Sequence, residues 1–328
     1  MKNIYPKKLQ KGDTVVVIAP SASMNIIKKE TIKNAVKSLE NLGLFVKYAK
    51  HVNEIDEFKS SSIESRIDDI HEAFRDKEVK AIIAVIGGFN CNQLLRGLDW
   101  NLIKNNPKIV CGFSDITALN NAMYAKTGLI TYYGPCFFTF GQKCCTQYTI
   151  DYFKKCLMSE PPYCLKPAKT WFSDKWYESK EDKYLIPNQG YWVLTEGAFK
   201  GTIVGGNLST FNLLQGTEYM SSLINSILFI EDNYESLPNH FDRDLQSLIQ
   251  QPGFSSVQGI MIGRFLKESK IDRNLLEKII KSKKELDNMP IIANVDFGHT
   301  DPKITFPIGG FCEISATDNK IEIKITKH

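Results

Sequence analysis

The chain has 328 residues, 43% of them hydrophobic and 24% charged, which is typical of a globular protein that buries a large core without disulfides or metals. Its 41 basic and 37 acidic residues nearly cancel to a net charge of +4, and no long basic run occurs. This balance argues against a nucleic acid polymer as partner. The N-terminus lacks the apolar core of a signal peptide, and no run approaches the ~20 apolar residues of a membrane span. We therefore expect a cytoplasmic protein that does not bind membranes.

The eight cysteines include no CxxC pair, and no Cys/His cluster has zinc spacing, so we expect no metal site. Several lie within apolar runs, where a free cysteine behaves as a small hydrophobe, and this usage fits a reducing cytosol. The adjacent pair Cys144-Cys145 is unusual, and the sequence assigns it no role.

Residues 1–160 alternate strand and helix patterns. The predicted strands are Thr14–Pro20, Leu44–Ala49, Ala81–Gly88 and Lys108–Cys111, and the predicted helices are 26–42, 61–74, 92–98 and 116–126. Continuously apolar strands that alternate with helices predict an α/β fold with a doubly wound parallel sheet. In such sheets ligands bind beyond the carboxyl ends of the strands.

The alternation ends after about residue 150. Residues 161–190 are polar, charged and rich in turn residues, and we interpret them as a linker or substrate loop. Residues 191–328 predict a smaller α+β domain with a mixed or antiparallel sheet. Its predicted strands are 201–207, 226–232, 257–265, 290–298 and 320–326, and its predicted helices are 208–215, 241–250 and 273–284.

A serine lies in the tight turn "GFSD" between the fourth strand and the next helix. Ser114 or Asp115 could simply cap that helix, as these residue types often do. Alternatively, Ser114 is a nucleophile at the carboxyl end of a central strand, in a turn that resembles a nucleophile elbow without its second glycine. The backbone N–H of Asp115 could then help to hold an oxyanion.

A serine nucleophile needs a nearby base, and the base needs an orienting acid. Of the five histidines, His299 follows an apolar strand and a glycine in a loop, where scaffolds present functional side chains, although a loop histidine is by default a surface residue. Glu231 and Asp232 end the apolar run "SILFIED", either as a solvated strand end or as a carboxylate that orients an imidazole.

Two adjacent glycines, Gly87 and Gly88, follow the third strand. Their lack of Cβ atoms would let the backbone approach a ligand, and Gly88 could supply a second oxyanion N–H. A tight turn between strand and helix explains them equally well. They do not fit the dinucleotide-binding pattern G-x-G-x-x-G.

Three motifs, "GFSDITAL", "FIEDNYE" and "NVDFGHTDP", together resemble the serine carboxypeptidases that include LD-carboxypeptidases and microcin C immunity proteins of the MccF type. The resemblance covers essentially the whole chain. It implies a Rossmann-like N-terminal domain, a smaller C-terminal domain, a homodimer and no cofactor. It places the nucleophile on Ser114, the acid on Glu231 and the base on His299, with oxyanion donors from the backbones of Gly88 and Asp115.

The segments "IGGFNCNQLL" and "TYYGP" resemble the MccF branch most closely. That branch uses a loop tryptophan to stack on the base of an aminoacyl-nucleotide, which suggests Trp176, or Trp171, as a substrate-binding residue, although both tryptophans could simply anchor the loop. Asn207 could bind a substrate carboxylate or cap a helix.

The expected function is hydrolysis of peptidyl-nucleotide or aminoacyl-nucleotide amides. One alternative with the same triad is an LD-carboxypeptidase that removes the terminal D-residue from peptidoglycan tetrapeptides. An alternative of another class is a ligand-binding protein of the same fold without catalytic activity.

Overall fold

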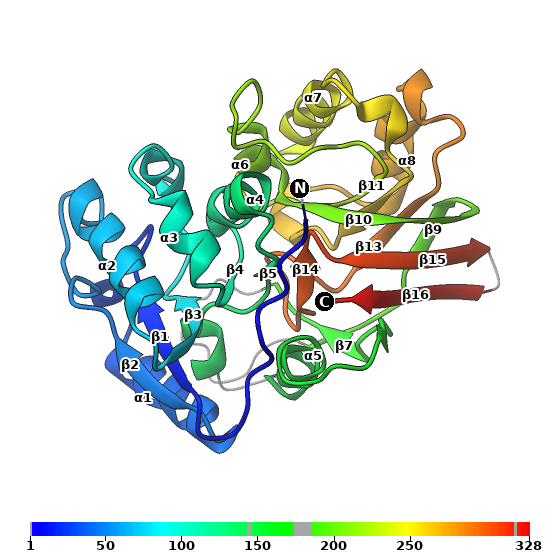
Figure 1. Cartoon of the computed structure of the whole chain (residues 1–328). Helices are drawn as coiled ribbons and strands as arrows, with labels where there is room; N and C mark the ends of the chain where they lie inside the picture. Colours follow the sequence, from blue (N-terminus) through cyan, green and yellow to red (C-terminus); the bar gives the residue numbers. More distant parts are fainter. Residues whose placement is uncertain (1, 143–145, 174–184, 318–319) are drawn as a thin grey trace.

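The computed structural model describes residues 2–142, 146–173, 185–317 and 320–328 (Figure 1). Two sheets organise these residues, one of six strands and one of eight, and a short two-stranded sheet accompanies them. The predicted α/β class is confirmed.

The first sheet has the strand order β14-β5-β4-β3-β1-β2. Its parallel strands are β1 (Thr14–Ile18), β2 (Phe45–Tyr48), β3 (Val79–Ala84), β4 (Ile109–Gly112) and β5 (Thr131–Tyr133). The central strands β3 and β4 are almost wholly buried, as their continuous apolar sequences predict. Because the chain runs outward in both directions from β1 and β3, the loops that follow these two strands face each other at a switch point where ligands commonly bind.

Helices cover both faces of this sheet (Figure 1). α2 (Ile63–Arg75) contacts α3 (Trp100–Asn105), which contacts α4 (Ile116–Thr127), while α1 (Lys29–Asn41) packs against the short helix η3 (Phe137–Gly141). Ser62 caps α2 by accepting a hydrogen bond from the backbone N–H of Ser65.

The second sheet has the strand order β6-β16-β15-β10-β11-β12-β13-β9. Its parallel centre consists of β10 (Gly197–Asn207), β11 (Ser226–Glu231), β12 (Gly259–Gly263) and β13 (Ile291–Val295). The antiparallel flanks are β6 (Tyr163–Cys164), β9 (Trp192–Thr195), β15 (Phe311–Thr317) and β16 (Lys320–Lys327). Of the two predicted alternatives, a mixed or an antiparallel sheet, the structure has the mixed one.

Four further α-helices complete the described part of the fold. They are α5 (Thr146–Leu157), α6 (Leu208–Asn212), α7 (Pro238–Ile249) and α8 (Arg273–Lys281). α4 contacts α6 and β10, so the helix that follows Ser114 lies at the junction of the two sheets. The amide of Asn121 on α4 donates a 2.7 Å hydrogen bond to the carbonyl of Gly205, which ties the two halves together.

The chain crosses between the sheets more often than its sequence pattern suggests. β14 (Phe306–Ile308) comes from the C-terminal half but pairs with β5 in the first sheet. The segment 161–190, interpreted as a linker, contributes β6 and the paired strands β7 (Thr170–Trp171) and β8 (Ile186–Pro187). The division at 160 and 190 remains a sequence-based proposal. Cys144 and Cys145 lie outside the described residues.

Candidate active site

Ser114 occupies a strained turn between β4 and α4. Its φ of +64° lies in the left-handed region, which a serine rarely adopts and which is typical of functional turns. Asp115 stands at the N-cap position of α4 without a side-chain cap bond, and the hydroxyl of Ser114 is directed to His299 instead. Helix capping, the simpler interpretation of this turn, therefore does not explain either side chain.

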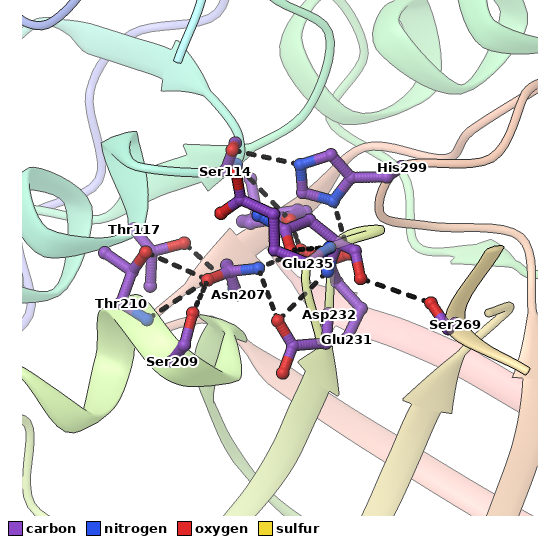
Figure 2. A network of polar contacts seen from close by, with 12 residues as sticks. Ser114, Thr117, Asn207, Ser209, Thr210, Glu231, Asp232, Glu235, Ser269 and His299 are labelled. Carbon is purple, nitrogen blue, oxygen red and sulfur yellow. Dashed lines mark hydrogen bonds and ion pairs between the residues drawn. The ribbon is translucent and has the colours of Figure 1, made fainter. Parts of the chain in front are cut away.

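Ser114, His299 and Glu231 form one chain of contacts (Figure 2). The hydroxyl of Ser114 lies 3.0 Å from Nε2 of His299, and Nδ1 of His299 lies 2.7 Å from Oε2 of Glu231. With Nδ1 protonated, the imidazole donates to the carboxylate and its Nε2 can accept the serine proton. The structure thus brings together the three residues that the sequence motifs single out, from β11 and from the turns after β4 and β13.

Glu231 is fully buried at the end of β11 and is held by three donors. Besides His299, the hydroxyl of Tyr133 donates to its Oε1 at 2.6 Å, and the amide of Asn207 donates to the same oxygen at 3.3 Å. Burial by itself raises the pKa of Glu231, but the charge of His299 and these hydrogen bonds outweigh it and lower the pKa below its usual value. The carboxylate therefore stays ionised beside the imidazole.

Two glycines allow His299 and Glu231 to approach each other. A Cβ atom on Gly298, whose φ is +98°, would lie 2.4 Å from Oε2 of Glu231. A Cβ atom on Gly263 would lie 2.7 Å from the Cβ of Glu231. Neither position can hold a larger side chain without displacing the carboxylate.

A cavity of about 310 Å³ opens beside Ser114 and His299. Gly87 and Gly88 form part of its wall, and a Cβ atom on Gly87 would lie 2.8 Å from the Cβ of Ser114. The glycine pair thus permits a close approach of backbone to the serine, rather than only a tight turn. The cavity is also lined by apolar and charged side chains, among them Ile26, Ile86, Phe89, Phe113, Phe138, Glu235, Leu266, Glu268, Asp301 and Lys303.

The side chains that line this cavity include more acidic than basic groups. Lys303 is buried and forms an ion pair with Asp301, whereas Glu235 and Glu268 are exposed carboxylates. His299 adds a positive charge only when protonated. Among the described residues, no group of three or more His, Cys, Asp or Glu side chains is arranged to hold a metal ion.

Two family models match the chain. The LD-carboxypeptidase N-terminal domain matches residues 15–134, and the LD-carboxypeptidase C-terminal domain matches residues 200–314. The chain belongs to the LD-carboxypeptidase family. The first matched segment contains Ser114, and the second contains Glu231 and His299. Membership makes the chain a peptidase, as the motifs predict.

Full-length relatives carry carboxypeptidase names. The chain is 51% identical to YocD of Bacillus subtilis (strain 168), named as a carboxypeptidase, over 99% of this chain and 100% of that protein. A protein of the same organism that is named as a murein peptide carboxypeptidase is 31% identical, over 98% of this chain and 95% of its own.

Solved structures of the family superpose closely. An MccF-like protein from Bacillus anthracis str. Ames has a TM-score of 0.98 and 49% identity, over 99% of this chain and 100% of its own. The microcin C7 self-immunity protein MccF in complex with aspartyl sulfamoyl adenosine has a TM-score of 0.87 and 30% identity, over 99% of both chains. These matches confirm the α/β architecture of this carboxypeptidase-family member.

The remaining predicted site residues lie in different surroundings. Asn207 is 2% exposed and does not line the cavity. Its side chain accepts a hydrogen bond from the N–H of Thr210, which caps α6, and it donates to Glu231. The interpretation as a helix cap is therefore the one the contacts support, and direct contact with substrate would require the asparagine to leave these partners.

The two loop tryptophans differ in what can be said of them. Trp176 lies outside the described residues. Trp171 lines a second cavity of about 430 Å³, and the guanidinium of Arg264 lies 5.0 Å from its ring centre. One face of Trp171 is thus occupied by a cation–π contact, which favours the anchoring interpretation of this residue.

Sequence reasoning did not single out Tyr133 or Ser21. Tyr133 bonds to Glu231 from β5, a strand that the apolar pattern did not reveal, although "TYYGP" appeared in the resemblance. Ser21 follows β1, and its hydroxyl donates a 2.6 Å hydrogen bond to Asp115. Both contacts join segments that lie about a hundred residues apart, so no local pattern could indicate them.

No helix in the described parts of the chain is both long and apolar enough to cross a membrane.

Proposed function

We propose that the chain hydrolyses an amide bond of a small substrate through a Ser114–His299–Glu231 triad. The observation that carries this proposal is the continuous contact from the serine hydroxyl through the imidazole to a buried carboxylate, at 3.0 and 2.7 Å. A neutral imidazole that is oriented by a carboxylate is the arrangement that activates a serine.

The reaction follows from this geometry. Oγ of Ser114 attacks the amide carbonyl carbon while its proton moves to Nε2 of His299. The new oxyanion accepts hydrogen bonds from the backbone N–H groups of Gly88 and Asp115. The carbon–nitrogen bond then breaks, and the leaving nitrogen takes the proton from His299. Water, deprotonated by His299, finally releases the acyl group from Ser114.

As substrate we propose an aminoacyl-nucleotide or peptidyl-nucleotide amide. Support comes from MccF, whose structure with aspartyl sulfamoyl adenosine superposes on this chain, and from the MccF-like structure at a TM-score of 0.98. The exposed carboxylates Glu235 and Glu268 in the cavity wall suit the free amino group that such a substrate carries.

A second candidate is a peptidoglycan tetrapeptide from which the terminal D-residue is removed. The relative named as a murein peptide carboxypeptidase supports it with 31% identity over nearly the whole chain. The same triad would act on both substrates. The expected homodimer and the cytoplasmic location stay predictions from the sequence.

Mass spectrometry of the purified protein with an aminoacyl sulfamoyl adenosine and with an LD-tetrapeptide separates the candidates. We expect release of the free amino acid and sulfamoyl adenosine from the first, and slower or no cleavage of the second. Cleavage of the tetrapeptide alone would establish the cell-wall activity. If the wild-type protein cleaves neither substrate and so behaves like Ser114→Ala, the result would support a binding protein without catalytic activity.

A further inference from the structure

The carboxylate of Asp115 points away from the helix that it precedes. It is 2% exposed, and its Oδ2 accepts hydrogen bonds from the hydroxyl of Ser21 at 2.6 Å and from the backbone N–H of Cys91 at 2.9 Å. No side-chain cap bond to α4 accompanies these contacts. A buried carboxylate with partners in two other loops has a task other than starting its own helix.

These two partners lie on either side of the glycine pair. Ser21 belongs to the loop after β1, and a Cβ atom on Gly88 would lie 2.2 Å from its Oγ. The backbone N–H of Ala22 donates a 3.2 Å hydrogen bond to the carbonyl of Gly87. Cys91 begins the short helix η2 (Cys91–Leu94) directly after the glycine loop. The carboxylate therefore holds the loops after β1 and β3 together at the switch point of the sheet.

We propose that Asp115 and Ser21 are positioning residues that fix the backbone of Gly87 and Gly88 relative to Ser114, and thereby set the geometry of the oxyanion site. The proposal rests on the proposed function, because it assigns the two N–H groups of that site to Gly88 and Asp115. One residue then serves both donors: its own N–H is the first, and its carboxylate places the second.

An oxyanion site requires that the backbone of Gly87 and Gly88 be held in a fixed position. Oxyanion donors act only when they lie about 2.7–3.1 Å from the developing charge, and they must be in place before the reaction. A glycine pair is flexible by nature, so its conformation must be imposed by neighbours. The hydrogen bond from Ser21 is short, and although burial raises the pKa of Asp115, the hydrogen bonds from Ser21 and from the backbone N–H of Cys91 favour the ionised carboxylate, for which such bonds are charge-assisted.

Burial raises the pKa of Asp115, and the nearby charge of Arg66 is among the effects that lower it. Arg66 donates to the carbonyls of Pro20 and Asn90, at 3.3 and 3.2 Å, and so holds the same two loops from outside. No ion pair joins its guanidinium to Asp115 within the described contacts. The hydrogen bonds of the carboxylate therefore go to loop groups next to the glycine pair rather than to Arg66.

The test measures how fast Ser114 reacts with an active-site fluorophosphonate. A bond forms between Oγ of Ser114 and the phosphorus of the reagent. The phosphorus–fluorine bond breaks and fluoride leaves, and the hydroxyl proton of Ser114 passes to His299. The rate of this reaction depends on the oxyanion site. It can be measured without knowing the native substrate. Ser21→Ala and Asp115→Asn are compared with wild type and with Ser226→Ala. Ser226 is a buried serine that bonds to the carbonyl of Leu223 at the opposite end of β11 from Glu231.

We expect Ser21→Ala and Asp115→Asn to label roughly tenfold to hundredfold more slowly, a part of the 10²–10³-fold effect of losing an oxyanion donor. Ser226→Ala should lower the melting temperature about as much as the other two substitutions do, but its Ser114 should be labelled at the wild-type rate. On a cleaved substrate, kcat should fall with little change in KM. If Ser21→Ala and Asp115→Asn are both labelled at rates within twofold of the wild-type rate, the positioning role is overturned. If wild type itself is not labelled at Ser114, the proposed nucleophile is wrong, which is a separate outcome. Should one variant not fold, the other decides.

Discussion

The hydroxyl of Tyr133 lies 2.6 Å from Oε1 of Glu231, and this bond joins the ends of strands that belong to different sheets. Burial raises the pKa of Tyr133 well above its usual range, so the hydroxyl stays protonated and donates. The acid of the proposed triad is thus held by the first sheet while its backbone belongs to the second.

Tyr133→Phe should lower kcat roughly tenfold with little change in KM, because a hydrogen bond to a charged group contributes roughly 1.5–3 kcal/mol. The fold should persist, since the ring stacks on Phe306 with centroids 4.9 Å apart. Tyr132→Phe is the matched control, because the neighbouring hydroxyl is buried without a hydrogen-bond partner among the described residues. Equal kinetics for the two variants would contradict the role of Tyr133.

Gly298→Ala should nearly abolish turnover. The added methyl group would lie 2.4 Å from Oε2 of Glu231 and would push the carboxylate away from His299. Gly216→Ala serves as the control, since Gly216 also has a positive φ, +73°, but no atom within 4 Å of the added Cβ. Both variants should lose stability from backbone strain, and only the first should lose activity. A fully active Gly298→Ala protein would show that Glu231 need not contact the imidazole closely.

Asp232→Asn should stabilise the protein at neutral pH. Burial raises the pKa of Asp232 to about 6, so the folded protein holds a proton that the unfolded chain releases at lower pH. Stability should therefore fall as the pH rises from about 4 to about 6, and the variant should escape this loss. Its gain over wild type, on the order of 1–3 kcal/mol, should appear at pH 7 and vanish near pH 4. Urea unfolding at both pH values measures it, and a gain independent of pH would argue against a raised pKa.

Trp176→Ala should lower kcat/KM for an aminoacyl-nucleotide by about tenfold or more, because stacking on a base contributes roughly 1–3 kcal/mol. An LD-tetrapeptide has no base, so its cleavage should scarcely change. Trp171→Ala is the comparison, because that ring already faces Arg264 and should affect stability more than substrate preference. Equal losses on both substrates for Trp176→Ala would mean that the loop is only structural.

Much of the first sheet could be predicted because β1, β3 and β4 are buried on both faces and so read as continuous apolar runs. β5 has only three residues, and its partner β14 returns from the far end of the chain. Short strands carry little periodic signal, and a crossing between sheets carries none.

The site shows the same limit. The turn around Ser114 was visible locally, since a strand, a tight turn and a helix follow one another, and the family motifs indicated Glu231 and His299. Glu231 and Asp232 both carry a carboxylate. Which of the two faces the imidazole of His299 depends on the direction of the side chains at the end of the strand. The contacts of Tyr133 and Ser21 depend on how distant segments meet. These features are set by packing rather than by local sequence.

The most direct test of the triad compares turnover of wild type with Ser114→Ala, His299→Ala, Glu231→Gln and the Ser114→Ala/His299→Ala double variant, on whichever substrate the protein cleaves. Residues that act as one unit have strongly non-additive effects. We predict that Ser114→Ala and His299→Ala each lower kcat by at least about 10³-fold, that Glu231→Gln lowers it less, and that the double variant is no slower than Ser114→Ala alone. A folded Ser114→Ala protein with near wild-type turnover, or a double variant whose loss equals the product of the single losses, would contradict the account.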